Sequence, residues 1–311
     1  MQQGRSIICR FIVWLGIIHF PLAVIAQERG PVLAFTSDTQ APLLIENAIR
    51  KINHNKKATD LIFHDIASHH PSCLFILGDV VSLGYMPSKW KEIDTCLQLF
   101  ADRKIPVYAV LGNHELMVNP AKGRRNFQAR FPTHSFLGYR EIVDSVAVIL
   151  LNSNFSAMTD SERIKQNNWY TNTIKEMEHD GSIKVIIVGC HHSPYTNSKV
   201  VKPSLEVRRE FLPAFLRSKK CVLFLSGHSH NFEQFKVGGK YFLVIGGGGG
   251  PHQALHTDNQ PTPDLANNYK PMFHYLEVRR SQDSLRVISR ELLPDLSGFR
   301  DGLAFTAGPS F

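Results

Sequence analysis

The sequence predicts an α/β (α+β) fold built on mixed β-structure, and three observations support this. Short apolar, β-branched runs bounded by glycine or polar clusters recur along the chain and predict buried strands. Segments with apolar residues at helical spacing lie between these runs in the first part of the chain. Closely spaced strand pairs, typical of hairpins, follow towards the C-terminus. Alternating strands and helices followed by hairpins indicate a sheet with both parallel and antiparallel neighbours.

The N-terminus predicts a secretory signal peptide at residues 1–26, which leaves 27–311 as the domain. Arg5 and Arg10 precede an apolar stretch that ends at Ala26 in a small-residue cleavage pattern. An uncleaved membrane anchor is the alternative, because an apolar run of about 16 residues is near the short limit for a span. The cleavage pattern favours removal. We therefore expect an exported protein, periplasmic or secreted, without stable membrane insertion.

The remaining chain of about 285 residues is long enough for one large domain with a substantial core. The whole sequence has a formal net charge of +8 at pH 7, and this modest excess suits an anionic substrate or surface. Basic residues are scattered apart from 122–125 and 208–209, so we expect no nucleic-acid polymer as a partner. The cysteines of the domain have no CxxC spacing, which argues against zinc-finger and thioredoxin classes and leaves their disulfide state open. They are Cys73, Cys96, Cys190 and Cys221.

The strand signals follow one another along the whole domain. One hairpin turns at Gly238-Gly239, a pair typical of two-residue hairpin loops. The predicted strands are 31–37, 73–77, 106–111, 143–152, 183–189, 221–226, 232–237, 240–246, 273–279 and 284–291.

Helical spacing of apolar residues predicts helices between several of these strands. Ser88 can cap one of them, and the segment 116–139, which has no clear period and several prolines and glycines, predicts a long functional loop. The predicted helices are 42–55, with Leu43, Ile45, Ala48, Ile49 and Ile52 in phase; 88–103, with Trp90, Ile93, Leu97 and Phe100 on one face; 160–178; and 204–218.

Five of the predicted strands end in residues that can bind a metal. In an open α/β sheet, the loops at the carboxyl ends of strands converge on one crevice. Carboxylate, amide and imidazole groups brought together there suit a divalent metal. The sequence therefore predicts a two-metal hydrolase site. The residues are Asp38, Asp79, Asn113 with His114, His191 with His192, and His228 with His230.

The individual residues each have a simpler alternative role. Asp79 follows a buried strand and a glycine, where a carboxylate is costly unless it is paired or bound to metal, although it could cap a turn. Asn113 could occupy a left-handed turn position. His228 and His230 point to the same side of an extended segment and could reach one metal each, whereas their alternative role is as surface histidines.

The motifs resemble those of the calcineurin-like metallophosphoesterases over roughly residues 31 to 290. The sequence GHSHNFE, followed by a strand and the glycines 246–250, is most similar to the purple-acid-phosphatase-like branch. The resemblance implies two packed mixed β-sheets flanked by helices. The matching motifs are Asp38-Thr39-Gln40, Gly78-Asp79, Gly112-Asn113-His114-Glu115, His192-Ser193-Pro194 and Gly227-His228-Ser229-His230.

The resemblance also implies a role for each residue of the site. Asp79 would bridge two metals, and His114 would be the general acid. Tyr195 and Asn197 follow the metal loop and are expected, with Asn113 and His114, to contact substrate. The remaining ligands would be Asp38, Gln40 and His230 for the first metal and Asn113, His192 and His228 for the second.

The match to the family departs from a simple one in three places. Gln40 stands where the family has histidine, and an amide oxygen prefers harder ions. The first site is therefore expected to be weaker or less selective for zinc, unless Gln40 only forms hydrogen bonds beside the ligands. His191 competes with His192, and the spacing to Pro194 favours His192. Ser82, and not Tyr85, occupies the position of the tyrosinate ligand of purple acid phosphatases, so we expect no tyrosinate.

The resemblance implies a metal-dependent phosphoester hydrolase that uses a metal-activated hydroxide at a dinuclear site. A phosphomonoesterase of acid-phosphatase type is the first hypothesis, with a small phosphorylated substrate. The alternatives are a phosphodiesterase or nucleotide pyrophosphatase with the same metals, and a weakly active binding protein of the same fold. The two ions would be divalent or trivalent iron, manganese or zinc. The physiological substrate and the oligomeric state stay open.

Overall fold

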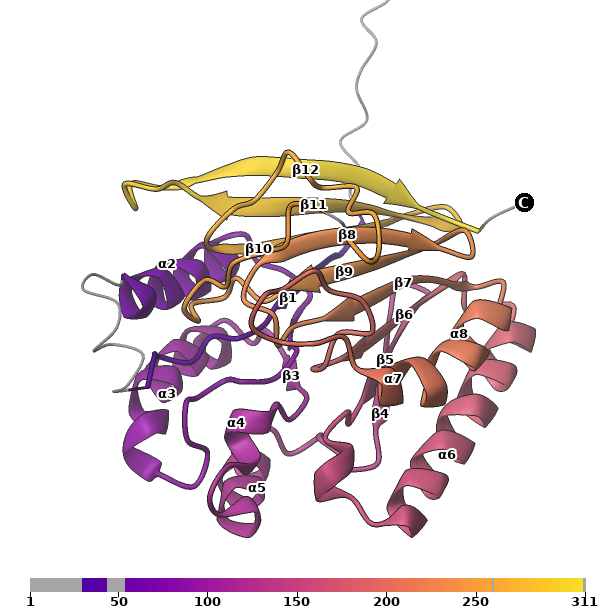
Figure 1. The fold of residues 1–311 in the computed structure, drawn as a ribbon, viewed down its shortest axis with the longest axis horizontal. Coiled ribbons are helices and arrows are strands. Elements are labelled where there is room, and N and C mark those ends of the chain that lie inside the picture. The colour runs from indigo at the N-terminus through magenta and orange to yellow at the C-terminus, as the bar shows by residue number, and fades with distance from the viewer. Residues whose placement is uncertain (1–29, 44–53, 259, 310–311) are drawn as a thin grey trace, which may run out of the picture.

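The structure, a computed structural model, describes residues 30–43, 54–258 and 260–309. Two six-stranded sheets pack against each other in this part of the chain, and helices cover the two outer faces (Figure 1). The predicted α/β (α+β) class, with two packed mixed sheets flanked by helices, is confirmed.

The first sheet has the strand order β12-β11-β10-β1-β2-β3. Its strands β1, β2 and β3 run parallel, whereas β10, β11 and β12 add antiparallel neighbours at one edge. The parallel strands carry polar residues directly after their carboxyl ends, so that these residues meet at one edge of the sheet. The bounds are β1 Val32–Thr36, β2 Cys73–Ile76, β3 Val107–Ala109, β10 His274–Ser281, β11 Ser284–Leu292 and β12 Phe299–Ala307.

The second sheet has the strand order β4-β5-β6-β7-β9-β8. Strands β5, β6, β7 and β9 run parallel, and β4 and β8 are antiparallel at the two edges. The bounds are β4 Tyr139–Val143, β5 Val146–Leu151, β6 Val185–Cys190, β7 Cys221–Ser226, β8 Phe232–Val237 and β9 Lys240–Ile245.

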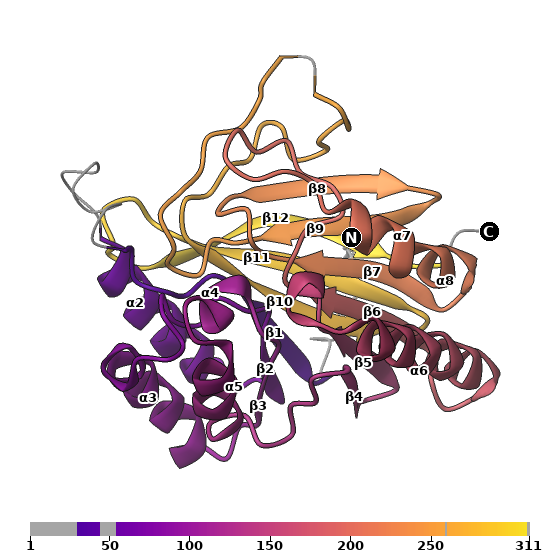
Figure 2. The same ribbon diagram turned by 60° about the horizontal axis from the view of Figure 1, so that its bottom comes forward.

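Helices lie on the outer face of each sheet (Figure 2). Helices α2 and α3 cover the first sheet, where Ile62, Trp90 and Leu74 belong to one buried apolar cluster. Helices α6, α7 and α8 cover the second sheet, where Phe211 packs over the strands. The bounds are α2 Asn55–Ser68, α3 Pro87–Asp102, α4 Asn113–Leu116, α5 Pro120–Gln128, α6 Asp160–His179, α7 Leu205–Glu210 and α8 Leu212–Arg217, with a 3₁₀ turn at Phe155–Ala157.

The central apolar layer lies between the two sheets and uses alternate residues of each strand. Phe35 and Phe75 stack at a ring separation of 4.8 Å, and Val185 and Ile187 of β6 face them across the layer. The intervening residues of the same strands face the helices. Both faces of the central strands are therefore buried, as in other sheets covered on two sides.

Every predicted strand is present, and the helices 88–103 and 160–178 are confirmed as α3 and α6. The predicted helix 204–218 is divided at Phe211 into α7 and α8, because Pro213 in the first turn of α8 has no backbone N–H with which to continue a helix. Most of the predicted helix 42–55 lies outside the described residues. Strands β4 and β12 and helix α2 were not predicted.

The prediction of a long loop at 116–139 is wrong for Pro120–Gln128, whereas 129–138 contains no helix or strand. Helix α5 occupies much of it, starting with Pro120 at a position where a missing N–H costs nothing. Asn119 caps this helix, since its side chain accepts a hydrogen bond from Lys122 N at 3.0 Å.

All four cysteines of the described chain are free and buried. Burial raises the pKa of the Cys73, Cys96 and Cys221 thiols to about 12. Among the described helices, none combines the length and the apolar character needed to cross a membrane.

Candidate metal centre

The predicted ligands gather at the carboxyl ends of strands from both sheets. Asp38 and Asp79 follow β1 and β2, whereas His191 and His228 follow β6 and β7. Asp38, Asp79 and His228 have φ values of 58°, 50° and 65°, a left-handed conformation that is uncommon except for small polar residues and histidine. These sharp turns at the strand ends set the direction of the side chains into the space between the sheets.

Backbone hydrogen bonds hold the first two ligand turns together. Asp38 N donates to Gly78 O at 3.1 Å, and Gln40 N donates to Asp79 O at 3.1 Å. The Asp38 carboxylate also accepts from His228 N, at 3.0 and 3.1 Å from its two oxygens. One carboxylate therefore joins a turn of the first sheet to a turn of the second.

Glu115, the last residue of the GNHE motif, fixes the backbone of the turn around Asp79 through hydrogen bonds. Its fully buried carboxylate accepts from the backbone N–H groups of Asp79 at 3.0 Å, Gly112 at 2.8 Å and Val81 at 3.1 Å. Burial raises the pKa of Glu115, and the nearby charge of Asp79 raises it further. Glu115 is therefore a positioning residue of the motif, and it acts on the backbone around Asp79.

Glycine is required beside both carboxylates because no side chain fits there. A Cβ atom at Gly112 would lie 2.1 Å from Asp79 Oδ1, and one at Gly227 would lie 2.3 Å from Asp38 Oδ2. The glycine run 246–250 packs behind the same turns, with Gly248 N and Gly250 N donating to the carbonyls of residues 37 and 38 at 2.9 and 2.7 Å.

The side chains form two overlapping groups with possible metal ligands. Asp38, Asp79 and His191 make one group, and His191, His192 and His228 make the other; in each group the potential ligand atoms lie within 4.8 Å of one another. The structure thus brings together predicted ligands from both sheets, and it adds His191 to them.

His191 has the geometry of a ligand whose ring is oriented by the backbone. Its Nδ1 lies 2.9 Å from Leu77 O, and its Nε2 lies 3.2 Å from Asp79 Oδ2 and 3.1 Å from Asn113 Oδ1. Burial lowers the pKa of His191, but the charge of Asp79 outweighs it and raises the pKa to about 9. The reverse interaction holds the pKa of Asp79 well below its usual range, although burial acts to raise it.

His230 is oriented in the same way on the other side of the site. Its Nδ1 donates to Pro251 O at 2.9 Å, and its Nε2 lies 3.3 Å from Asp38 Oδ1. Burial acts to lower the pKa of His230, but the hydrogen bond and charge of Asp38 raise it overall. Each buried carboxylate therefore favours protonation of the histidine beside it.

The amide of Gln40 is held with its oxygen towards His230. The orientation that satisfies both ends has the NH₂ group donating to Asp38 O at 3.2 Å and Asp79 O at 2.8 Å, which leaves Oε1 3.2 Å from His230 Nε2. Gln40 is 2% exposed. An amide oxygen is therefore fixed beside the Asp38 carboxylate and His230.

His114 is oriented by two contacts with the loop after β2. Its backbone N–H donates to Asp79 Oδ1 at 2.9 Å, and its ring Nδ1 donates to Ser82 O at 2.9 Å. Its Nε2 lies 3.8 Å from Asp79 Oδ2, and the ring is partly exposed. Because the carbonyl of Ser82 fixes Nδ1 as a donor, Nε2 is the nitrogen that can exchange a proton with a substrate.

The two predicted substrate contacts lie in the loop after His192. The Tyr195 ring packs 5.1 Å from the ring of Phe242, and the guanidinium of Arg208 lies 4.4 Å above its face. Asn197 is buried, and its Nδ2 donates to Thr262 O at 3.0 Å. These contacts tie the loop to the second sheet and to a neighbouring loop, and a substrate contact by either residue stays a prediction.

Glu233, in the GHSHNFE motif, anchors this loop. Its buried carboxylate accepts from Thr196 Oγ1 at 2.5 Å and from Asn197 N at 2.6 Å. Burial raises the pKa of Glu233 to about 7, and these two hydrogen bonds partly offset the rise. Glu233 thereby connects the loop after His192 with the strand after His230.

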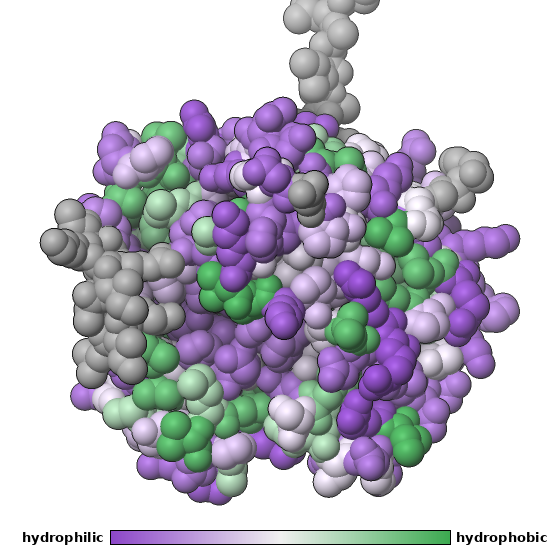
Figure 3. Space-filling model, viewed as in Figure 1, coloured by the Kyte–Doolittle hydropathy of each residue, from purple (hydrophilic) through white to green (hydrophobic). Residues whose placement is uncertain are grey.

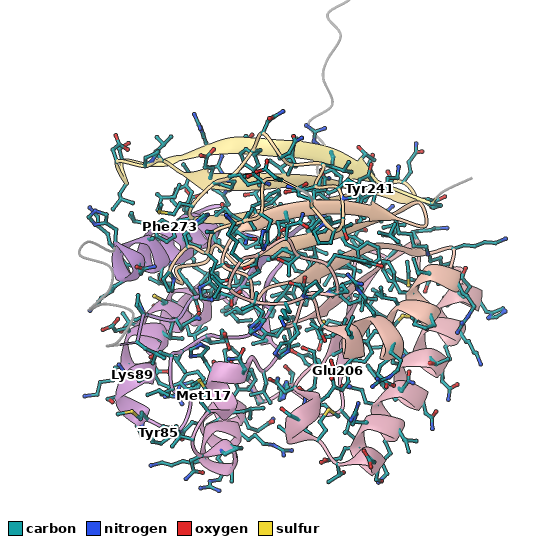
Figure 4. The ribbon with its side chains drawn as sticks, viewed as in Figure 1. Tyr85, Lys89, Met117, Glu206, Tyr241 and Phe273 are labelled. Atoms are coloured by element: carbon teal, nitrogen blue, oxygen red, sulfur yellow. The ribbon has the colours of Figure 1, made fainter. Side chains whose placement is uncertain are left out.

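One face of the molecule is hollowed and polar. In the space-filling view, hydrophilic residues line a hollow near the middle of this face (Figure 3). Tyr85 lies beside α3 towards the outer edge of the molecule (Figure 4). Ser82 stands three residues after Asp79, and its carbonyl holds His114.

The family model of the calcineurin-like phosphoesterases matches residues 31–232. The chain therefore belongs to the calcineurin-like phosphoesterase family. No curated protein sequence matches the chain.

Solved structures share the fold at low sequence identity. The purple acid phosphatase PPD1 of yellow lupin (Lupinus luteus) is similar with a TM-score of 0.68 and 14% identity over 90% of this chain, which spans 54% of the lupin chain. A dimetal phosphatase of Danio rerio gives 0.61 and 13% identity over 90% of this chain and 99% of that one. GAP50, the anchor in the inner membrane complex of Plasmodium, gives 0.60 and 13% identity over 90% and 89%.

Replacing Glu233 by glutamine is expected to reduce the pH dependence of stability between about pH 4.5 and 7. Because the pKa of Glu233 is higher in the folded chain than in the unfolded chain, the folded chain binds this proton more tightly. Its contribution to stability is therefore fully present below about pH 4.5 and is lost as the pH rises to about 7. The unfolding free energy of the wild type relative to that of Glu233→Gln, measured in urea, should fall between about pH 5 and 7.5. Equal differences in wild type and variant would contradict this, and the exposed Glu92→Gln is the matched control.

Proposed function

We propose that the chain is a metal-dependent phosphoester hydrolase, most simply a phosphomonoesterase acting on a small phosphorylated substrate. The observation that carries this proposal is that two buried carboxylates each lie beside a histidine whose ring is oriented by a backbone carbonyl. Asp38 with His230 and Asp79 with His191 place carboxylate oxygen and imidazole nitrogen side by side, at 3.3 and 3.2 Å. Membership in the calcineurin-like phosphoesterase family supports the same class of reaction.

The donor groups suit two cations. In His191 and His230, Nδ1 donates to a backbone carbonyl, so that the neutral ring offers the lone pair of Nε2. Asp38, Gln40 and His230 would hold one ion, and Asp79 would be shared. Asn113, His228 and one of the adjacent pair His191 and His192 would hold the other. Bound ions in such a site stabilise charge on phosphoryl oxygens and make an attacking water more acidic.

The protein groups around the ions would position the substrate and move the proton. Phosphoryl transfer requires mainly position and charge stabilisation, which the fixed turns of the site can supply. His114, oriented by Ser82 O, would donate a proton from Nε2 to the departing oxygen.

We also propose that the protein is exported to the periplasm or the medium, which is supported by the signal-peptide pattern of residues 1–26.

Removal of metal is expected to abolish hydrolysis of p-nitrophenyl phosphate, and reloading with manganese, iron, zinc or magnesium is expected to restore it. The ratio of activity on this monoester to activity on bis-p-nitrophenyl phosphate distinguishes a phosphomonoesterase from a phosphodiesterase. Absence of turnover with every metal, in protein shown to be folded by circular dichroism, would overturn the proposal in favour of a binding protein of the same fold.

Replacing His114 by alanine should lower kcat by about 10²–10⁴-fold, because the leaving oxygen loses its proton donor. The metal content, measured by inductively coupled plasma mass spectrometry, should stay at the wild-type value, since Asp79 and the imidazoles of the site are unchanged. A loss of metal in proportion to the loss of activity would show instead that His114 supports the ligands.

Replacing Gln40 by histidine is expected to raise the affinity for zinc relative to manganese, because imidazole is a softer ligand than an amide oxygen. Gln40→Leu is the matched variant without a ligand atom. It should lower the affinity of one of the two sites for both zinc and manganese. Competition titrations with the two metals give the affinity ratio. An unchanged ratio in Gln40→His would mean that residue 40 does not contact the ion.

A further inference from the structure

A cavity of about 710 Å³ lies between helices α2 and α3, beside the candidate metal centre. Buried residues, among them Thr39 and Ser82, form its inner end, and exposed residues of the two helices form its mouth. Thr39 directly follows Asp38 in the sequence, and the carbonyl of Ser82 holds the ring of His114. The inner end therefore adjoins the turns that carry a candidate ligand and the candidate acid.

Both helices begin at this cavity, because residues of the first turn of each belong to its lining. The first N–H groups of a helix have no partner within the helix, and the aligned peptide dipoles place partial positive charge there. Neither N-cap residue, His54 or Met86, contributes a side-chain hydrogen bond, and neither first turn contains an acidic residue. The two helix starts therefore present positive potential to one cavity, and this favours an anion.

Lysine side chains add full charges to the same place. Lys56 and Lys57 lie in the first turn of α2, and Lys89 lies in that of α3, where a cation meets the unfavourable end of the helix dipole. Lys56 is paired with Glu92 of α3 at 2.8 Å, whereas Lys57 and Lys89 form no ion pair with another described residue. Asp60 is the one further acid among the described residues of the lining. Two ammonium groups are therefore available to an anion.

The side chain of Ser82 points independently to a ligand in this cavity. Ser82 is 2% exposed, and its Oγ has no hydrogen-bond partner in the described part of the chain. A buried hydroxyl without a partner is unfavourable, because it has lost its hydrogen bonds to water. Since Ser82 belongs to the lining, a polar group bound at the inner end can supply the missing partner.

We propose that this cavity binds the leaving group of the substrate, and that the substrate is a phosphomonoester whose alcohol carries a second phosphate group. The phosphoryl group to be hydrolysed lies at the metal centre, the alcohol extends past Ser82, and the second phosphate lies between Lys57 and Lys89. A phosphate with about two negative charges matches two unpaired ammonium groups. This inference rests on the proposed function, since it names the substrate class of the same site.

The test compares symmetrical alkanediol bisphosphates with the corresponding hydroxyalkyl phosphates, which lack the second phosphate. Release of inorganic phosphate by manganese-loaded wild-type protein is measured over a series of spacers from ethane to octane. After correction for the two equivalent ends, kcat/KM should be higher for the bisphosphate at one or more spacer lengths, by about 2- to 5-fold for each lysine that contacts it. Added salt should reduce this preference, because exposed charges are screened.

Three variants and a control assign the preference to the cavity. Lys57→Met and Lys89→Met keep most of the apolar stem and remove the charge, so each should lower the ratio of bisphosphate to monophosphate kcat/KM by about 2- to 5-fold. Glu92→Gln should raise the ratio, because it removes an acid and releases Lys56. The exposed Lys175 of α6 gives the control Lys175→Met, with a wild-type ratio.

The opposite results would overturn the inference. A wild-type ratio near one at every spacer length would show that the leaving group needs no second phosphate. A preference that Lys57→Met and Lys89→Met leave unchanged, or that Glu92→Gln lowers, would place the second phosphate outside this cavity. Failure of the proposed function is distinguishable, because wild type would then hydrolyse neither ester of any pair, and the inference would fail with it.

Discussion

The rest of the structure depends on the burial of two carboxylates, Asp38 and Asp79, between the two sheets. They are 0% and 1% exposed, and an ionised carboxylate removed from water costs several kcal/mol unless other groups compensate it. His230 and His191 compensate them with positive charge, and backbone amides contribute hydrogen bonds. The left-handed turns, the glycines without room for a Cβ and the buried Glu115 all maintain this arrangement.

The histidines around the two buried carboxylates differ in their exposure. His191 and His230 are buried, are oriented through Nδ1 by backbone carbonyls, and direct Nε2 at a carboxylate. His114, which is partly exposed, is held through Nδ1 by Ser82 O and keeps Nε2 for a substrate. The partly exposed His114 and the buried His191 therefore both lie beside Asp79.

The sequence predicted the strand ends well because each ligand follows an apolar run, and the burial of a run is independent of details elsewhere in the chain. It favoured His192 over His191 from the spacing to Pro194, whereas both side chains lie in the group of possible ligands with His228. Alternation along β6 could not separate the two, because both faces of this strand are buried and its residues are apolar on either side.

The other differences arise from contacts between segments that are separate in the sequence. Pro120 and Gly123 suggested a loop at 116–139, but Pro120 stands at a helix start and Gly123 is needed where the helix touches Glu115, since a Cβ there would lie 1.9 Å from Glu115 O. The orientation of Gln40, too, depends on the carbonyls of Asp38 and Asp79, which come from separate segments. Such contacts across the fold cannot be read from residue spacing.

A site whose groups come from the ends of both sheets couples cation binding to the assembly of the sandwich. An ion held between Asp38 of the first sheet and His230 of the second would add a cross-link between two halves that are already joined by apolar packing and by hydrogen bonds such as those from His228 N to the Asp38 carboxylate. Because an unfolded chain offers no such site, binding adds to the free energy of unfolding by mass action, by about 2.7 kcal/mol when the free ion is at 100 times its Kd. Metal supply would then set how much of the chain is folded as well as how fast it turns over.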